Sequence, residues 1–167
     1  MRIQLRIGKI EDPKLKEVVT NAKPTIRILG HIKLKIFKED RIFEALIDTG
    51  AHISVIPKKI WEGAEAKVLG SYAIRGIVSK KECEVPVKIG KITLKLIDKT
   101  GYETEEKEIL AYLAETNEVP LILGFRDLLE DFKLVLDVKT KEAYLEDKTI
   151  GLIAPSNWIL KRDNHAG

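Results

Sequence analysis

The chain has 167 residues, 44% of them hydrophobic, and 29 Lys and Arg against 26 Asp and Glu give a formal net charge of +3. This length favours one domain with a real core, and the interleaved charges argue against a nucleic-acid-binding surface. No run approaches the roughly 20 apolar residues of a membrane span and no signal-peptide core is present, so we expect a cytoplasmic protein without membrane contact.

Short apolar segments, rich in β-branched residues and separated by turn residues, follow one another along the chain and predict strands. In residues 32–38 lysines alternate with apolar residues, which is typical of a half-buried strand with its lysines facing solvent. The predicted strands are residues 2–7, 25–37, 41–47, 53–56, 72–78, 83–89, 91–97, 108–114, 120–123 and 132–138.

Helical patterns are scarce. Residues 13–19 predict one helix with Pro13 in its first turn, residues 58–63 a turn or two, and residues 126–132 a short amphipathic helix. The fold class is therefore mainly β, and many short strands at this spacing favour a closed or nearly closed barrel.

Asp48 is placed unusually, because it directly follows the apolar strand segment 43–47 and precedes Thr49-Gly50 and the next apolar run. A carboxylate at the rim of a core costs free energy unless it accepts hydrogen bonds or shares a proton. It either caps its own turn or takes part in catalysis, and the tripeptide alone leaves both interpretations open.

A second segment, residues 119–137, contains an apolar strand, Gly124, a predicted short helix and another strand. The pairing of Ile-Asp-Thr-Gly-Ala with a later apolar-apolar-Gly and a helix resembles the retroviral-type aspartic proteases, the retropepsin-like family. The resemblance implies an acid-protease barrel with one short helix after the second motif, in which Gly124 lets the later strand pass close to the Asp-Thr-Gly loop. The resemblance covers residues 30–138, which we expect to be the protease domain. Residues 1–29 would then be an N-terminal extension. Residues 139–167 would be a C-terminal extension that packs on the domain or on the dimer interface.

The resemblance also implies roles for individual residues. Asp48 is the catalytic acid, the Thr49 hydroxyl braces two loops against each other, and the Gly50 amide orients the carboxylates. The segment "VLGSYAIRG", residues 68–76, corresponds to the flap over the substrate, although an ordinary hairpin is the alternative interpretation. The implied substrate-binding residues are Ala51, His52, Gly70, Ile74 and Gly76.

Catalysis in this family needs two carboxylates facing one water. Asp98 lies in "LIDKTG", where the inserted Lys99 misplaces the glycine, and Asp137 has no turn after it, so neither suits as the second acid. The resemblance therefore predicts a homodimer with Asp48 on the two-fold axis, cleaving polypeptide without metal or other cofactor. A non-catalytic dimerising peptide-binding or scaffolding module is the main alternative, and an enzyme acting on another substrate is a third.

Several positions depart from the family pattern or lie outside it. His52 stands where retroviral members carry an aspartate, and because His31 and His165 are not at metal-ligand spacing from it, we expect His52 at the solvent edge. Cys83 is the only cysteine, so we expect a structural thiol in a reducing compartment. The apolar segment around Trp158 is expected to pack as an anchor.

Overall fold

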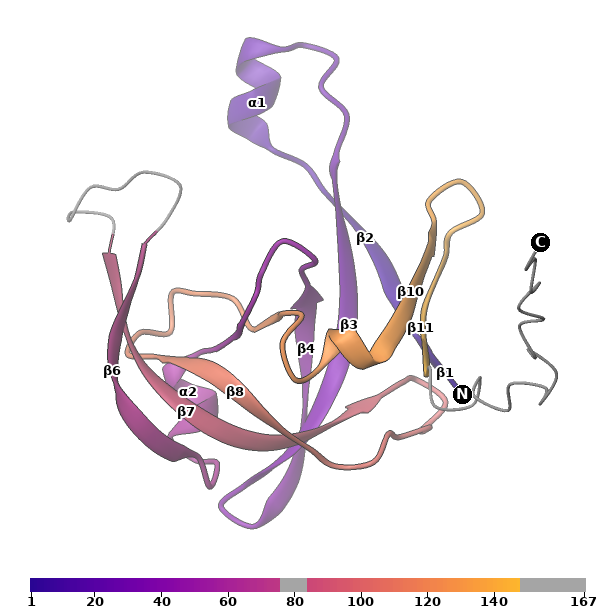
Figure 1. The fold of residues 1–167 in the computed structure, drawn as a ribbon. Coiled ribbons are helices and arrows are strands. Elements are labelled where there is room, and N and C mark those ends of the chain that lie inside the picture. The colour runs from indigo at the N-terminus through magenta and orange to yellow at the C-terminus, as the bar shows by residue number, and fades with distance from the viewer. Residues whose placement is uncertain (76–83, 148–167) are drawn as a thin grey trace, which may run out of the picture.

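The computed structural model describes residues 1–75 and 84–147, and Gly76, Cys83 and Trp158 lie outside them. Two short helices and many strands make up the described chain (Figure 1). The elements up to the flap region are β1 (Arg2–Gln4), β2 (Arg6–Ile10), α1 (Pro13–Val18), β3 (Thr25–Ile36), β4 (Glu39–Ile47), β5 (Ser54–Ile56), α2 (Lys58–Trp61) and β6 (Lys67–Arg75). Those that follow are β7 (Glu84–Ile97), β8 (Lys107–Ala114), β9 (Ile122–Leu123), the 3-10 turn η2 (Leu129–Asp131), β10 (Phe132–Asp137) and β11 (Glu142–Asp147).

Six strands close into a barrel in the order β3, β4, β9, β5, β8 and β7, and the ring is completed where β7 pairs with β3. The pairs β4–β9 and β5–β8 are parallel, whereas the other pairs of the ring are antiparallel. The predicted mainly β class and closed barrel are therefore confirmed. β6 extends the sheet at the free edge of β7, and β2 extends it at β3.

The core fills the barrel because alternate residues of each strand face inward. In β3, Ile32 and Leu34 are buried while Lys33 and Lys35 point outward, as the alternating pattern predicts. Other strands of the ring contribute Ala45, Ile47, Ile56, Ile92, Leu94, Leu96, Ile109, Ala111, Leu113 and Leu123. β7 runs unbroken through Gly90, where two strands were predicted, and Gly90 pairs with Ala111 of β8 within it. Glycine is required there because a Cβ would lie 2.6 Å from Leu113 and 2.8 Å from the carbonyl oxygen of Lys67.

A second sheet, β1–β11–β10, packs beside the barrel (Figure 1). Ile3 of β1 pairs with Leu145 of β11, and both side chains belong to the hydrophobic core. Sequence reasoning missed β11, because its sequence "EAYLED" contains three acidic residues. They do not prevent strand pairing, since the central three residues, 143–145, are the buried ones.

The predicted helices over residues 13–19 and 58–63 are confirmed as α1 and α2, and the Asp12 side chain caps α1 by accepting from the Leu15 amide. Neither reaches the length of a membrane-spanning helix, nor does any other helix in the described ranges. The helix predicted over 126–132 is reduced to the turn η2. Asp127 has a positive φ of 60°, and its carboxylate accepts from the Leu110 amide of β8 over 3.0 Å, which stops a regular helix there.

Candidate active site

Asp48 begins the turn that follows β4. Its amide donates to the Leu123 carbonyl over 3.0 Å, and its side-chain oxygen Oδ1 accepts from the Gly50 amide over 2.9 Å. No hydrogen bond to the other oxygen, Oδ2, comes from any residue of the described chain. The carboxylate is half-buried, and Thr49 and Gly50 are exposed at the tip of the turn. Capping therefore accounts for one carboxylate oxygen and leaves the second available.

Gly124 passes directly beneath this turn, as the resemblance implied. The parallel pair β4–β9 brings it there, since Ile47 lies opposite Leu123. Beyond the glycine, the Phe125 amide donates to the Ala51 carbonyl over 3.0 Å. A Cβ on Gly124 would lie 2.8 Å from that same Ala51 oxygen and from the carbonyl carbon of Ile53. These are backbone atoms that cannot move aside, so the crossing requires glycine.

Ser54 is a part of this arrangement that sequence reasoning missed. Its side chain is fully buried, and its hydroxyl oxygen accepts from the Gly124 amide over 3.0 Å. A lone serine within the apolar segment 53–56 was the only signal in the sequence. The hydroxyl satisfies a buried amide that would otherwise lack a partner, and it joins β5 to the end of β9.

His52 lies at the solvent edge, as expected, and its carbonyl accepts from the Arg126 amide over 2.8 Å. His31 lies elsewhere, on β3, with its ring 3.9 Å from Glu44. Among the described residues, no group of three or more His, Cys, Asp and Glu side chains is arranged to hold a metal ion.

The proposed flap residues Gly70 and Ile74 lie on β6, opposite Ile89 and Val85 of β7. The pairing shifts register between Val68 and Gly70, and a Cβ on Gly70 would meet no atom within 4 Å. In Figure 1 the open ends of β6 and β7 lie on the same upper side of the barrel as the turn after β4. The described part of the flap segment is thus one strand of a hairpin on the Asp48 side.

A row of side chains on the outer face of the sheet runs from the Asp48 turn to β6. The adjacent strands β4, β9, β5, β8, β7 and β6 each contribute one residue at matching register, and we call these residues the apolar row: Leu46, Ile122, Val55, Tyr112, Ile89 and Gly70. The five side chains are half-buried, while the residues on either side of Leu46, Ile122, Val55 and Tyr112 in the sequence are buried. The row could not be read from the sequence, because it depends on the strand register.

Two tyrosines close the β6 end of the apolar row. The rings of Tyr72 and Tyr112 stack with centroids 5.8 Å apart and an interplanar angle of 3°. Burial and the neighbouring Tyr72 raise the pKa of the Tyr112 hydroxyl, while the positive charge of Arg126 lowers it in part. Arg126 follows the Gly124 crossing, so its charge reaches this end of the row.

Asp98 and Asp137 hold turns of their own. Asp98 accepts from the Thr100 hydroxyl over 2.6 Å and from the Thr100 amide over 2.8 Å. Burial raises the pKa of the Asp98 carboxyl, but these bonds and those from the Tyr102 and Gln4 amides bring it below its ordinary value. Asp137 accepts from the Lys139 and Thr140 amides. Both carboxylates are therefore committed to local structure.

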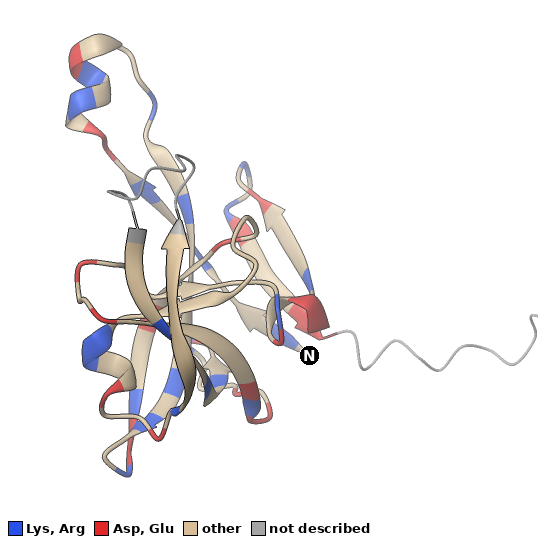
Figure 2. Cartoon of the chain, turned by 60° about the vertical axis from the view of Figure 1, so that its left-hand side comes forward, with Lys and Arg blue, Asp and Glu red and all other residues tan. Residues whose placement is uncertain are grey.

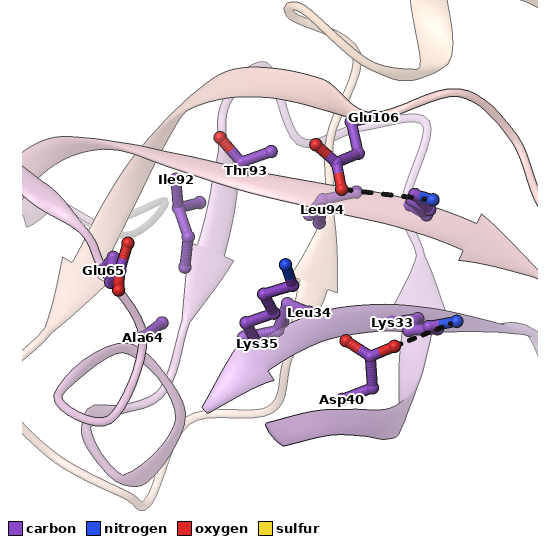
Figure 3. Close-up of a pocket in the computed structure, with 11 residues that line it drawn as sticks. Lys33, Leu34, Lys35, Asp40, Ala64, Glu65, Ile92, Thr93, Leu94 and Glu106 are labelled. Atoms are coloured by element: carbon purple, nitrogen blue, oxygen red, sulfur yellow. Dashed lines mark ion pairs between the residues drawn. The ribbon is translucent and has the colours of Figure 1, made fainter. Parts of the chain in front are cut away.

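A pocket of about 440 Å³ lies at the opposite end of the barrel, beside the β3–β4 turn (Figure 3). Its floor is the buried side chains of Leu34, Ile92 and Leu94. At its rim Lys33 pairs with Asp40 over 3.3 Å, and Lys95 pairs with Glu106 over 4.0 Å. No residue of the Asp48 turn lines it. Positively and negatively charged residues are interspersed along the described chain (Figure 2).

A closed barrel in which an Asp-Thr-Gly turn is braced by a crossing glycine defines a domain of the aspartic protease class. The family model described as "Retroviral aspartyl protease" matches residues 20–137, and the chain belongs to this family. Among solved structures, the chain is similar to a retropepsin-like aspartic protease from Rickettsia conorii, at 17% sequence identity and a TM-score of 0.43. That likeness covers 84% of this chain and 92% of the other. A search of curated proteins finds no match.

Proposed function

We propose that the protein is an aspartic endopeptidase that acts as a homodimer. The observation that carries this proposal is the Asp48 turn, whose carboxylate has one oxygen bound to the Gly50 amide and the other available. Asp98 and Asp137 are engaged in turns of their own. A second copy related by a two-fold axis supplies the missing acid, because an isologous contact places identical residues opposite each other.

In the proposed mechanism, a water lies between Asp48 and the partner subunit's Asp48. Two close carboxylates cannot both be ionised, so one carries a proton and the other does not. The ionised acid takes a proton from the water as its oxygen attacks the scissile carbonyl carbon, and the protonated acid donates to the carbonyl oxygen. The tetrahedral intermediate then collapses as the leaving nitrogen is protonated, and no covalent enzyme intermediate forms.

The neighbouring residues have supporting roles in this proposal. Among the described residues none hydrogen-bonds the exposed Thr49 hydroxyl, so it is available to brace the partner's turn. An extended substrate lies along the apolar row, which receives alternate side chains of the peptide. Further proposed substrate contacts come from the Asp48 turn and the flap: Ala51, His52, Gly70, Ile74 and Gly76.

We retain residues 30–138 as the proposed protease domain, with residues 1–29 and 139–167 as extensions. Within the extensions, β1, β2 and β11 pair with one another or with strands of the domain. The single cysteine supports a proposed cytoplasmic location, because a reducing compartment keeps thiols free.

Incubating the pure protein with denatured casein across a pH series, with and without pepstatin, tests the proposal. Pepstatin-sensitive cleavage that is lost in Asp48→Asn is the expected result. Peptide affinity without cleavage at any pH would instead favour the dimerising binding module, which needs no paired carboxylate. Cleavage by the Asp48→Asn protein would refute the catalytic assignment.

A further inference from the structure

Residues 10–26 form a projection that we call the arm. It consists of the end of β2, helix α1 and the start of β3, and it stands clear of the barrel in both views (Figures 1 and 2). None of the residues of α1 is buried, and the Val18 side chain is 83% exposed. The large apolar side chains that the arm exposes are Ile10, Leu15, Val18, Val19 and Ile26.

The arm gains little from the rest of the chain. A helix of six residues is far too short to be stable in isolation, and α1 is held by the Asp12 cap and by the pairing of Ile10 with Thr25 at its base. Leu15, Val18 and Val19 are spaced i, i+3 and i+4, so their exposed apolar side chains gather on one side of α1 and its C-cap, and exposed apolar side chains grouped in this way mark an interaction site. The arm is therefore a surface that needs an occupant.

The strand register fixes the direction of the arm. β3 is antiparallel to β4 with Leu29 opposite Leu46, so residues 25–27 continue past the end of β4 by about 10 Å. That end of β4 is where the Asp48 turn begins. The arm thus projects on the Asp48 side of the barrel and beyond the turn, as Figure 1 shows.

The same side offers apolar surface outside the arm. Phe125, directly after the Gly124 crossing, is exposed, and so are Leu136 and Val138 beside the β10–β11 turn. In Figure 1 this turn also lies on the upper side of the molecule. A second copy seated over Asp48 would bring such a surface within reach of the arm.

We propose that the arm is a dimer clasp, packing its apolar side chains on the second copy beside the Asp48 turn. The inference rests on the proposed function, because the two-fold site places that copy on the side to which the arm points. Each subunit contributes one arm, so the contact is made twice and secures the pairing of the two turns. The occupant is a second copy of this chain and not a substrate protein.

Removing the arm tests the clasp. Because Ile10 and Thr25 are paired, an Asn-Gly turn can replace residues 11–24 and close β2 and β3 as a hairpin. We expect this variant to retain its melting temperature at high protein concentration. Its dimer dissociation constant should rise at least tenfold. The protein concentration that gives half-maximal specific activity should rise by the same factor. Sedimentation velocity and a casein assay over a dilution series measure these quantities.

A matched pair of substitutions gives a second test. Val18→Glu places a charge on the arm, whereas Ile42→Glu places one on an equally apolar, 58% exposed position of β4 away from the Asp48 turn. We expect Val18→Glu to weaken the dimer at least tenfold and Ile42→Glu to leave it unchanged.

The outcomes separate the clasp from the proposed function. If the armless variant and Val18→Glu are as dimeric and as active as the unaltered chain, the clasp proposal is wrong and the protease proposal is unaffected. An unaltered chain that dimerises through the arm but never cleaves casein would keep the clasp and overturn the protease. If the arm variants remain dimeric but bind casein more weakly, the arm binds substrate and the clasp proposal is wrong. If the unaltered chain is active as a monomer, both proposals are wrong.

Discussion

The amide of Gly124 donates a hydrogen bond of 3.0 Å to the hydroxyl oxygen of Ser54, and both residues are buried. This bond joins the end of β9 to β5, and the Asp48 turn lies between β4 and β5. The position of the Asp48 carboxylate therefore depends on a contact that involves no catalytic atom.

Ser54→Ala tests this dependence. The substitution leaves a buried amide without an acceptor, which costs about 1–3 kcal/mol of stability. A loss near 2 kcal/mol lowers the melting temperature by about 4–8 °C in a domain of this size. We expect kcat to fall as well, and calorimetry with casein kinetics measures both. Thr93→Ala, at an exposed position on β7 away from the Asp48 turn, serves as the control and should change neither.

Gly124→Ala should be more damaging, because the added Cβ meets backbone atoms at 2.8 Å. Overpacking at such a site costs about 3 kcal/mol. We expect a large fall in urea midpoint together with loss of activity. Gly70→Ala, where nothing lies within 4 Å of the added Cβ, is the matched control and should keep the unaltered midpoint. Equal effects of the two substitutions would contradict the assigned role of the crossing.

Asp48→Asn separates capping from catalysis. The amide oxygen of asparagine can still accept from the Gly50 amide, so the turn and the melting temperature should be retained. Removing two facing charges should leave the dimer as stable or more so. Proteolysis should be abolished, because asparagine cannot take a proton from water. Unaltered protein should show a bell-shaped pH profile that belongs to the pair.

Asp98→Asn tests a pH dependence of stability. The folded-state pKa of Asp98 lies below its ordinary value, so its contribution is present above the unfolded pKa of about 3.9 and is lost as pH falls through the folded value. We expect Asp98→Asn to lower the urea midpoint at pH 7, and we expect this difference to shrink as the pH falls below the unfolded pKa of about 3.9. The exposed Asp137, changed to Asn, should have a smaller effect at pH 7. A difference in urea midpoint between Asp98→Asn and the unaltered chain that is as large at pH 2 as at pH 7 would contradict this pH dependence.

Tyr72→Ala examines the apolar row. Tyr72 is about half exposed, so its removal costs little stability beyond the stacking contact with Tyr112, about 0.5–1.5 kcal/mol. If substrate lies along the row, KM for peptides should rise several-fold while kcat changes little. Steady-state kinetics on a set of peptides measures this, and an unchanged KM for every peptide would place the substrate-binding surface elsewhere.

The role of Gly76 in a closing flap stays a prediction.

The sequence predicted those features whose cause is local. Alternating residues over 32–38 indicated which side chains of β3 face solvent, and the family resemblance carried by the Asp-Thr-Gly motif and Gly124 implied the crossing. Features that depend on register or on distant partners were missed. Ser54 gains its role only from Gly124, the acidic β11 is a strand because β1 and β10 flank it, and the helix over 126–132 is interrupted because Asp127 bonds to β8.

The parallel pairing of β4 with β9 also determines when the Asp48 site can form during synthesis of the chain. Leu46 and Ile122 are neighbours in the sheet although 122 − 46 = 76 positions separate them in the sequence. During synthesis, Asp48 leaves the ribosome long before Gly124 exists, so the turn then lacks its support. Contacts of such long range also make folding slow. We expect the nascent chain to have no peptidase activity until β9 has been made, which protects it and its neighbours from premature cleavage.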